Sequence, residues 1–345
     1  MPRILLSYSV HRSRRWSQIL LILPFCCQRL HKMSGEDNYT DYDTIIAEIE
    51  SRENATKQYQ HVIRMIYLIT YSVVLILGVT LNFIVIIISC LKNKKSTTVS
   101  SWITALALTH LVSSAFIVYQ LLYAYNNFDW NYGNTSCKLS SYITYGSMFS
   151  TAAMLSLWSI SSAILKIDCL NLCKNCNIIL ISLSWAIAAI LACPSLYSRE
   201  VRSSQCIDDY DTDELKTTQE GIARLKAVVI MRFLIGLLAP ALVMFLSCLT
   251  SAHRKCKDCK EQAQIICAIK IAFFVFWGPQ IFLTMLQATV TNSLDPIMLK
   301  YGLPVATALA TAHSLISPVI YLLFGFSFKM KWMEHDSGQC ETVLD

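Results

Sequence analysis

Seven stretches of mostly apolar residues follow one another along the chain, with polar residues gathered in the short segments between them. They cover residues 65–90, 96–128, 139–165, 178–198, 227–249, 271–294 and 301–324. Each reaches the about 20 residues that a helix, rising about 1.5 Å per residue, needs to cross about 30 Å of hydrocarbon. Because they are apolar on all sides, their expected surroundings are lipid. The pattern predicts an all-α membrane protein with a bundle of seven transmembrane helices.

Composition agrees with this class. Hydrophobic residues are 54% and charged residues 15% of the 345 residues, against about 45–50% and about 25% in ordinary soluble domains. The formal net charge is +6, but the basic residues follow particular apolar stretches and do not form one basic face. Topology therefore explains them better than nucleic-acid binding does.

The charge of the connecting segments predicts the orientation. Basic residues concentrate after the first, third and fifth stretches: Lys92, Lys94, Lys95, Lys166, Lys174, Arg254, Lys255, Lys257 and Lys260. The positive-inside rule places these loops in the cytoplasm. The segment 33–61 and the loop around residues 208–214 are acidic and belong outside. We expect a multi-pass plasma-membrane protein with an extracellular N-terminus and a cytosolic C-terminus.

Four parts of the chain are expected. Residues 1–32 are basic and lack a small-x-small cleavage site, so we interpret them as an upstream extension, with an inefficient signal sequence as the alternative. Residues 33–61 form an extracellular acidic tail and residues 62–325 the seven-transmembrane domain. Residues 326–345 alternate apolar and basic side chains at first, which predicts an amphipathic helix along the inner membrane surface and a short cytoplasmic tail.

The acidic tail carries candidate modification sites. Asn38 and Asn54, together with Asn134 further along, are N-glycosylation acceptors, and all three lie on the side predicted to be exterior. Tyr39 and Tyr42 are bracketed by carboxylates, as tyrosine sulfation requires, and a sulfated tail would attract a cationic ligand. A solvated, disordered tail accounts for the same composition equally well.

Short motifs occur in a characteristic order along the seven stretches. They are Gly78, Asn82 and Val85 in the first, Trp130 and Cys137 before the third, Trp185 in the fourth, Pro240 in the fifth, Phe273, Trp277 and Pro279 in the sixth, and Ser317, Pro318 and Tyr321 in the seventh. By these residues the chain, from about Tyr67 to Trp332, resembles rhodopsin-like (class A) G protein-coupled receptors. The segments from Met231 to Pro240 and from Ser317 to Phe328 are similar to the chemoattractant receptors, which recognise formyl peptides, complement anaphylatoxins and chemerin.

The resemblance implies a receptor that binds an extracellular peptide or small anionic ligand and signals to heterotrimeric G proteins. It assigns core and switching roles to Asn82, His110, Trp185, Ser162, Pro240, Phe273, Pro279, His313, Pro318 and Tyr321. The three prolines each remove an intrahelical hydrogen bond and permit bending. Trp277 would form the pocket floor, where a ligand can bias the sixth helix.

Two cysteines fall on the side predicted to be oxidising. Cys137 begins the third helix and Cys206 lies in the acidic fourth loop, and no other cysteine after Met33 is placed on that side. We expect a disulfide that holds this loop over the bundle; two free thiols are the alternative.

Arg232 is the one charged residue within the apolar stretches, about five residues or ~8 Å below the outer end of the fifth helix. Because a charge in lipid costs at least ~2.5 kcal/mol, it is expected to face a polar cavity. Its guanidinium would bind a ligand carboxylate; a structural ion pair or snorkelling to the headgroups is the alternative. The ligand contacts that we expect are Arg232, Trp277, Tyr145, Arg224 and Lys226.

Several positions depart from the family pattern. Ser161, Ser162 and Ala163 stand where the family has Asp-Arg-Tyr, whose arginine contacts the G protein. His110 replaces the sodium-binding aspartate, so no sodium site is expected. Cys248 and Ser317 replace a tyrosine and an asparagine of the switch network. These changes make G protein coupling doubtful and leave a decoy, partner subunit or degenerate orphan receptor as the alternative.

Histidines and cysteines offer further chemistry. His110 and His313 would form a proton switch or a soft-metal pair, although hydrogen bonding to Thr151, Ser314 or water is the more common arrangement. The cytosolic Cys-x-x-Cys pairs, Cys173 with Cys176 and Cys256 with Cys259, would suit structural zinc, but palmitoylation or reduced thiols are commoner fates. We expect neither a metal nor a cofactor.

Other classes fit less well. The membrane region has no paired carboxylates and no nucleophile with a base, which disfavours an enzyme. A retinal protein requires a Schiff-base lysine, and residues 301–328 contain none. A multi-span transporter would show repeated halves with broken helices, and no internal repeat is found.

Overall fold

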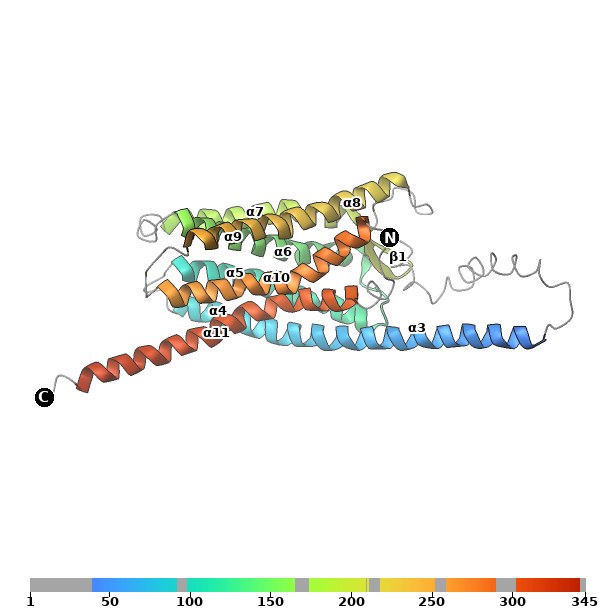
Figure 1. Ribbon diagram of the computed structural model, residues 1–345, viewed down its shortest axis with the longest axis horizontal. Coiled ribbons are helices and arrows are strands. Elements are labelled where there is room, and N and C mark those ends of the chain that lie inside the picture. Colours follow the sequence, from blue (N-terminus) through green and yellow to red (C-terminus); the bar gives the residue numbers. More distant parts are fainter. Residues whose placement is uncertain are drawn as a thin grey trace.

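Seven helical rods lie side by side in the computed structural model (Figure 1), which describes residues 39–91, 98–164, 174–208, 210, 218–251, 259–289 and 302–341. The first rod joins α3 (Tyr39–Val73), a π-helical segment (Val74–Gly78) and α4 (Val79–Leu91). The next three are α5 (Thr98–Tyr125), α6 (Gly133–Ile164) and α7 (Lys174–Ser198). The fifth joins α8 (Gln219–Phe233), a second π-helical segment (Leu234–Leu238) and α9 (Ala239–Ser251), and α10 (Cys259–Thr289) and α11 (Leu303–Glu341) follow.

Six of these rods are long and apolar enough to cross a membrane by the length and composition of their described residues. α6 corresponds to the third predicted span. Its described residues are less hydrophobic than this criterion requires, because the helix is rich in serine. Its polar side chains Ser140, Ser150 and Thr151 are buried in the bundle, where α6 contacts α5, α7, α9 and α10. Neighbouring helices take the place of lipid around this rod, so a less apolar sequence suffices.

The outer surfaces of the rods are apolar. Ile76 on the first rod, Ile190 on α7 and Phe245 on α9 are each more than 60% exposed. Large apolar side chains on the outside of a helix bundle are typical of a lipid-facing surface. In the interior, Trp102, Leu155 and Phe273 are fully buried and join α5, α6 and α10 in one core.

Local irregularities follow from particular residues. Pro240 has no N–H to donate, and it comes two residues after the end of the second π-helical segment, whose extra residue per turn accommodates the missing hydrogen bond. Gly78 ends the first π-helical segment, and a Cβ at this position would lie 2.6 Å from the Ser114 Oγ. Only a glycine therefore allows the first rod to approach α5 this closely.

A β-hairpin closes one end of the bundle, the right-hand end in Figure 1. Its strands are β1 (Arg199–Arg202) and β2 (Gln205–Asp208), paired antiparallel across a two-residue turn. Ser203 and Ser204 have φ values of 48° and 62°, as the favoured two-residue hairpin turns require. We call this end of the bundle the hairpin end.

Covalent and polar contacts hold the hairpin to the bundle. The expected disulfide is present between Cys137 and Cys206, with Cα atoms 5.7 Å apart. The Val201 N–H donates to the Asn134 Oδ1 at 2.9 Å, and the Trp130 N–H donates to the Ser204 carbonyl at 2.7 Å. The hairpin is thus fixed to the start of α6 and to the preceding loop.

Two regions differ from the sequence-based expectation. The acidic segment, expected as a tail, is helical from Tyr39 onward, because residues 39–61 contain no Pro or Gly and Glu48 pairs with Arg52 at 2.6 Å along the helix. The amphipathic helix expected from residue 326 is not separate from the seventh rod, since α11 continues to Glu341. Residues 326–341 contain no proline that would interrupt its hydrogen bonding.

Some predicted features lie outside the described residues. These are the extension 1–32, the acceptor Asn38, the basic residues Lys92, Lys94, Lys95, Lys166, Arg254, Lys255 and Lys257, and Cys173 and Cys256 of the two cysteine pairs. Ser162 lies on α6, but its side chain, like that of Cys248 on α9, is outside the part of the chain whose side chains are described.

Candidate ligand-binding site

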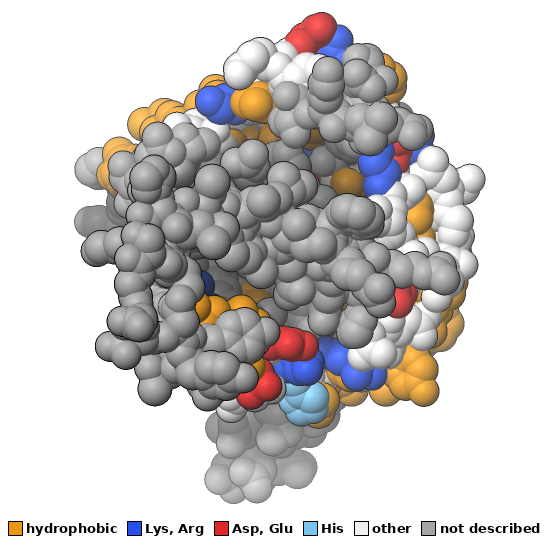
Figure 2. Space-filling view, turned by 90° about the vertical axis from the view of Figure 1, so that its right-hand side faces the viewer, with side chains coloured by type: hydrophobic (Ala, Val, Ile, Leu, Met, Phe, Trp, Pro, Cys, Tyr) orange, Lys and Arg blue, Asp and Glu red, His pale blue; other side chains and the backbone are white. Residues whose placement is uncertain are grey.

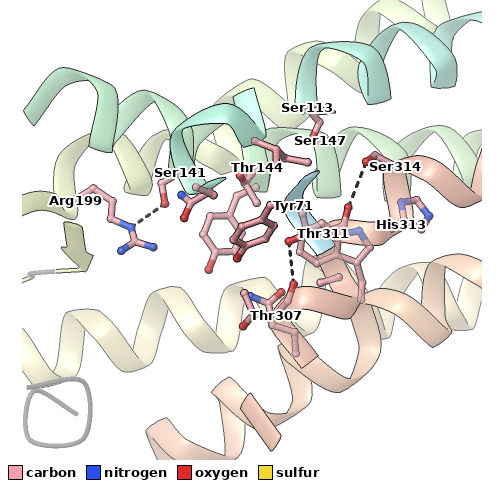
Figure 3. Close-up of a pocket in the computed structure, with 16 residues that line it drawn as sticks. Tyr71, Ser113, Ser141, Thr144, Ser147, Arg199, Thr307, Thr311, His313 and Ser314 are labelled. Atoms are coloured by element: carbon pink, nitrogen blue, oxygen red, sulfur yellow. Dashed lines mark hydrogen bonds between the residues drawn. The ribbon is translucent and has the colours of Figure 1, made fainter. Parts of the chain in front are cut away.

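A cavity of about 110 Å³ lies inside the bundle near the hairpin end. Hydroxyl groups dominate its lining, from Ser113, Ser141, Thr144, Ser147, Thr307, Thr311, Ser314, Tyr71 and Tyr145. Arg199 lies at one end of the cavity and His313 at the other (Figure 3). Among the described lining residues, Arg199 is the single arginine, lysine or carboxylate. The cavity therefore suits a polar group, with positive charge at the end nearest the hairpin.

Trp277 lines this cavity and is 5% exposed. Pro279 follows it within α10, and Phe273 lies one turn before it and packs edge to face on the His313 ring at 5.6 Å. Trp277 thus lies in the lining of the cavity, and its role as a pocket floor that contacts a ligand remains a prediction.

Arg232 projects from α8 into a buried position beside the hairpin. Its Cζ lies 3.6 Å from the centroid of the Tyr145 ring, a cation–π contact. Its Nη2 donates to the Ser195 Oγ at 3.3 Å, and its Nη1 is 3.9 Å from the Asp208 Oδ2. This is the structural ion pair that sequence reasoning kept as the alternative. Tyr145, unlike Arg232, lines the cavity itself.

Arg199 is the cation that reaches the cavity, and sequence reasoning missed it. Its Nε donates to the Ser141 Oγ at 2.7 Å (Figure 3) and lies 3.1 Å from the Asp208 Oδ1. Its Nη1 donates to the Cys206 carbonyl at 2.9 Å. The available signal was a basic residue directly after the fourth apolar stretch, in a loop that has more acidic than basic residues.

Arg199 and Arg232, which we call the arginine pair, share one carboxylate. Asp208 presents one oxygen to each of them. Two guanidiniums and one carboxylate leave an excess of one positive charge in a largely buried place, where electrostatic interactions are stronger than in water. An anionic group of a ligand would be attracted to this excess charge.

Tyr210 follows β2 and is 7% exposed. Burial, together with the neighbouring Asp208 carboxylate, raises the pKa of its hydroxyl to about 12. The hydroxyl therefore stays protonated at neutral pH and adds no negative charge beside the arginine pair.

Arg224 and Lys226, expected to extend the positive site, lie nearer the start of α8. Arg224 forms an ion pair with Glu220 one turn away on the same helix, and both side chains are exposed. Neither Arg224 nor Lys226 lines the cavity. Exposed pairs of this kind contribute little, so any role of these two residues in ligand binding remains a prediction.

The two histidines lie deep in the bundle. The ring centroids of His110 and His313 are 5.0 Å apart with the rings nearly perpendicular, and His110 Nε2 is 3.2 Å from the Thr151 Oγ1. The expected hydrogen bond to Thr151 is confirmed. Among the described residues, no group of three or more His, Cys, Asp or Glu side chains could hold a metal ion.

Other residues singled out by sequence hold rods together. The Asn82 Nδ2 donates to the carbonyl oxygens of Gly78 at 2.8 Å and Ser314 at 2.9 Å, so it joins the first and seventh rods. The Trp185 Nε1 donates to the Thr109 Oγ1 at 2.9 Å, joining α7 to α5. Pro318 lies within α11, and Tyr321, one turn later, packs against the main core.

The opposite end of the bundle is built differently. The rings of Trp102 and Trp158 are stacked with centroids 6.0 Å apart and planes 5° apart, and both are buried. Trp158 lies one helical turn before Ser162 on α6. Ser161, which precedes Ser162 in the sequence, is 5% exposed. An apolar stack therefore adjoins the place where the family pattern has its arginine.

Comparison with known proteins agrees with this architecture. Residues 81–321 match the family model described as 7 transmembrane receptor (rhodopsin family). The chain belongs to this family of seven-helix G protein-coupled receptors. It is a multi-pass membrane receptor and not an enzyme.

Its relatives include chemoattractant-type receptors. Chemerin-like receptor 1 of Homo sapiens is 28% identical over 325 residues, which cover 86% of this chain and 84% of that protein. Chemerin-like receptor 1 of Sus scrofa is 27% identical over 316 residues, 85% of each chain. Chemerin-like receptor 2 of Mus musculus is 26% identical over 290 residues, 80% of each chain.

Proposed function

We propose that this protein is a plasma-membrane receptor for a peptide, and that the arginine pair binds the peptide's C-terminal carboxylate. One observation carries the proposal: two largely buried arginines share a single carboxylate directly beside a hydroxyl-lined cavity. A ligand carboxylate would supply the second negative charge, and guanidinium groups bind carboxylates with directed hydrogen bonds.

The proposal requires the hairpin end to face the outside of the cell. A disulfide between Cys137 and Cys206 persists on an oxidising side of a membrane, and it lies at this end. Two exposed glycosylation acceptors, Asn54 and Asn134, belong to the same end. Both features support an extracellular hairpin.

The size of the cavity limits what enters it. Pockets for small molecules usually measure about 300–1,000 Å³, whereas this cavity measures about 110 Å³. We expect only the last residues of a peptide to occupy it. Basic and acidic side chains lie around the rim of this end (Figure 2), where the rest of a peptide would make its contacts.

Chemerin is the first peptide ligand to test. Relatives named chemerin-like receptors align with this chain over 80–86% of its length. Coverage of this extent on both chains supports a shared mode of ligand entry.

Binding of paired peptides tests the carboxylate site. A short synthetic peptide ending with the C-terminal residues of chemerin is made as the free acid and as the amide. We expect the acid to bind wild-type receptor tighter by about a hundredfold, as for a buried charge pair, and Arg232→Ala to abolish this preference. Arg52→Ala, which removes an exposed arginine of α3, serves as the control and retains the preference. Equal binding of acid and amide to the wild type would refute the carboxylate site.

We also propose that the receptor activates a heterotrimeric G protein through contacts that do not need the missing arginine. Agonist-stimulated nucleotide exchange by wild-type receptor tests this directly. If the wild type is silent, the triple variant Ser161→Asp, Ser162→Arg, Ala163→Tyr separates two explanations. A gain of activity identifies a decoy receptor with an otherwise intact transmission path, and continued silence identifies a deeper loss of coupling.

A further inference from the structure

The arginine pair is already in contact with a carboxylate that belongs to the receptor. Asp208 is the last residue of β2, two positions after Cys206, and the disulfide holds this strand on the bundle. Its side chain is 19% exposed, so it lies at the boundary between the hairpin and the buried site. Any ligand carboxylate that approaches the arginine pair meets this negative charge.

The two arginines hold Asp208 unequally. Arg199 lies at 3.1 Å from one oxygen and also donates to Ser141 and to the Cys206 carbonyl, so it anchors the hairpin. Arg232 lies 3.9 Å from the other oxygen, which is beyond hydrogen-bond distance, and its bond to Ser195 is long at 3.3 Å. The contact with Asp208 is therefore the weak one at Arg232, and a better placed carboxylate can replace it.

We propose that Asp208 is an internal competitor of the ligand carboxylate at Arg232, and that it sets which ligands bind. This inference rests on the proposed carboxylate site and adds how that site is regulated. A side chain tethered two residues from a disulfide is always present at high effective concentration. A free carboxylate alone competes poorly with it, whereas a peptide whose terminal residues also fill the hydroxyl-lined cavity gains the additional contacts that it needs.

The Asp208 charge is expected to lower the affinity of the receptor for a ligand carboxylate. A ligand carboxylate at Arg232 lies within a few ångströms of Asp208, and two like charges at that distance repel each other in a place of low dielectric. Neutralising Asp208 removes both the repulsion and the rival for the guanidinium. Asparagine has the same shape as aspartate and keeps one side-chain oxygen, so an oxygen can still lie near the Arg199 Nε.

The experiment compares Asp208→Asn with wild type, using the acid and amide forms of the chemerin-derived peptide. We expect the variant to bind the acid about tenfold tighter, a change of about 1.4 kcal/mol, and to bind the amide with unchanged affinity. Asp129→Asn is the matched control, since it removes an exposed carboxylate from a loop at the same end that is not an ion-pair partner of Arg199 or Arg232 among the described residues. It should leave both affinities unchanged.

The outcomes separate this inference from the function on which it rests. If wild type prefers the acid but Asp208→Asn binds it no tighter, the competition is refuted and the carboxylate site stands. If Asp208→Asn weakens acid and amide equally, Asp208 only supports the hairpin, and the competition is again refuted. If acid and amide bind alike to every form, the carboxylate site itself is refuted.

Discussion

Buried charge distinguishes the hairpin end of the bundle from the opposite end. At the hairpin end Arg199, Asp208 and Arg232 lie together in largely buried positions, covered by a disulfide-linked hairpin. At the opposite end the described interior is held by the apolar stack of Trp102 on Trp158. Buried charges are costly unless they are paired, and replacing them by apolar groups is often stabilising.

The difference indicates that the hairpin end serves a purpose other than stability. An excess positive charge beside a cavity is useful for holding a ligand, and it is difficult to explain by packing. The Trp102 and Trp158 stack needs no such explanation, because it buries a large apolar area next to the position where serine replaces the family's arginine. We therefore expect substitutions at the hairpin end to change ligand affinity, and those in the tryptophan stack to change stability without changing ligand affinity.

The largest effect is expected from removing the disulfide by Cys137→Ser. The bond closes a loop with a sequence separation of 69, and in the chain-entropy model a loop of this size stabilises by about 4 kcal/mol. The hairpin, and with it Asp208, would also lose its anchor. Thermal unfolding and peptide binding of purified receptor measure both effects. Cys193→Ser, which removes an exposed free thiol, should change neither; full binding by Cys137→Ser would contradict the prediction.

Trp158→Ala tests the opposite end. It removes a buried ring that is stacked on Trp102, and large-to-small changes of this kind cost about 3 kcal/mol or more. We expect a lower unfolding temperature and an unchanged acid-to-amide preference in the folded fraction. Ile160→Ala on the same helix, at a side chain 36% exposed, is the control for losing an apolar side chain at the surface. A changed acid-to-amide preference in Trp158→Ala would break the separation between the two ends.

Arg199→Gln is expected to have a moderate effect at the hairpin end. The glutamine can still reach polar neighbours but cannot balance Asp208, so the acid peptide should bind about tenfold more weakly. Arg202→Gln is the matched change on the same strand, because the Arg202 side chain is about as accessible as that of Arg199 but lies 3.4 Å from Glu200 and not beside Asp208. Its effect on binding of the acid peptide should be small. If the two variants behave alike, Arg199 has no special role in the site.

The sequence was sufficient to predict the seven rods, their order and the disulfide. Long apolar stretches can be recognised locally, and Cys137 and Cys206 stood out because few cysteines fall at that end. Arg232 was found because it interrupts an apolar stretch. The helical path of residues 39–61 and the unbroken α11 were not predicted, since charge and amphipathic patterns do not determine where a helix begins or ends.

Arg199 and Asp208 show why the rest of the site could not be predicted. Both lie in a connecting loop, where the sequence suggested only an acidic segment. Their roles depend on the hairpin register, in which Arg199 is paired with Asp208 across the two strands. That register places both beside Ser141 of α6 and Arg232 of α8, and no local pattern encodes such a meeting of distant segments.

Tyr210 offers the smallest and most local test of the hairpin end. Its pKa is raised from 10.0 to about 12, chiefly by burial and secondly by the Asp208 carboxylate. Below pH 10 the hydroxyl is protonated in both folded and unfolded chains, and its contribution to stability is complete. Between pH 10 and about 12 the unfolded chain loses a proton that the folded chain keeps, so stability falls as pH rises.

Tyr210→Phe removes this dependence, because phenylalanine has no proton to lose. We expect the unfolding temperatures of wild type and variant to differ by a constant amount from pH 8 to pH 9 and to shift in favour of the variant from pH 10 to pH 11. Tyr197→Phe, at a side chain 72% exposed, is the control and should follow the wild type. Parallel curves for wild type and Tyr210→Phe across the whole range would mean that Tyr210 is accessible to water. The hairpin would then cover the arginine pair less completely than the contacts of Asp208 indicate, and the contrast between the two ends would weaken accordingly.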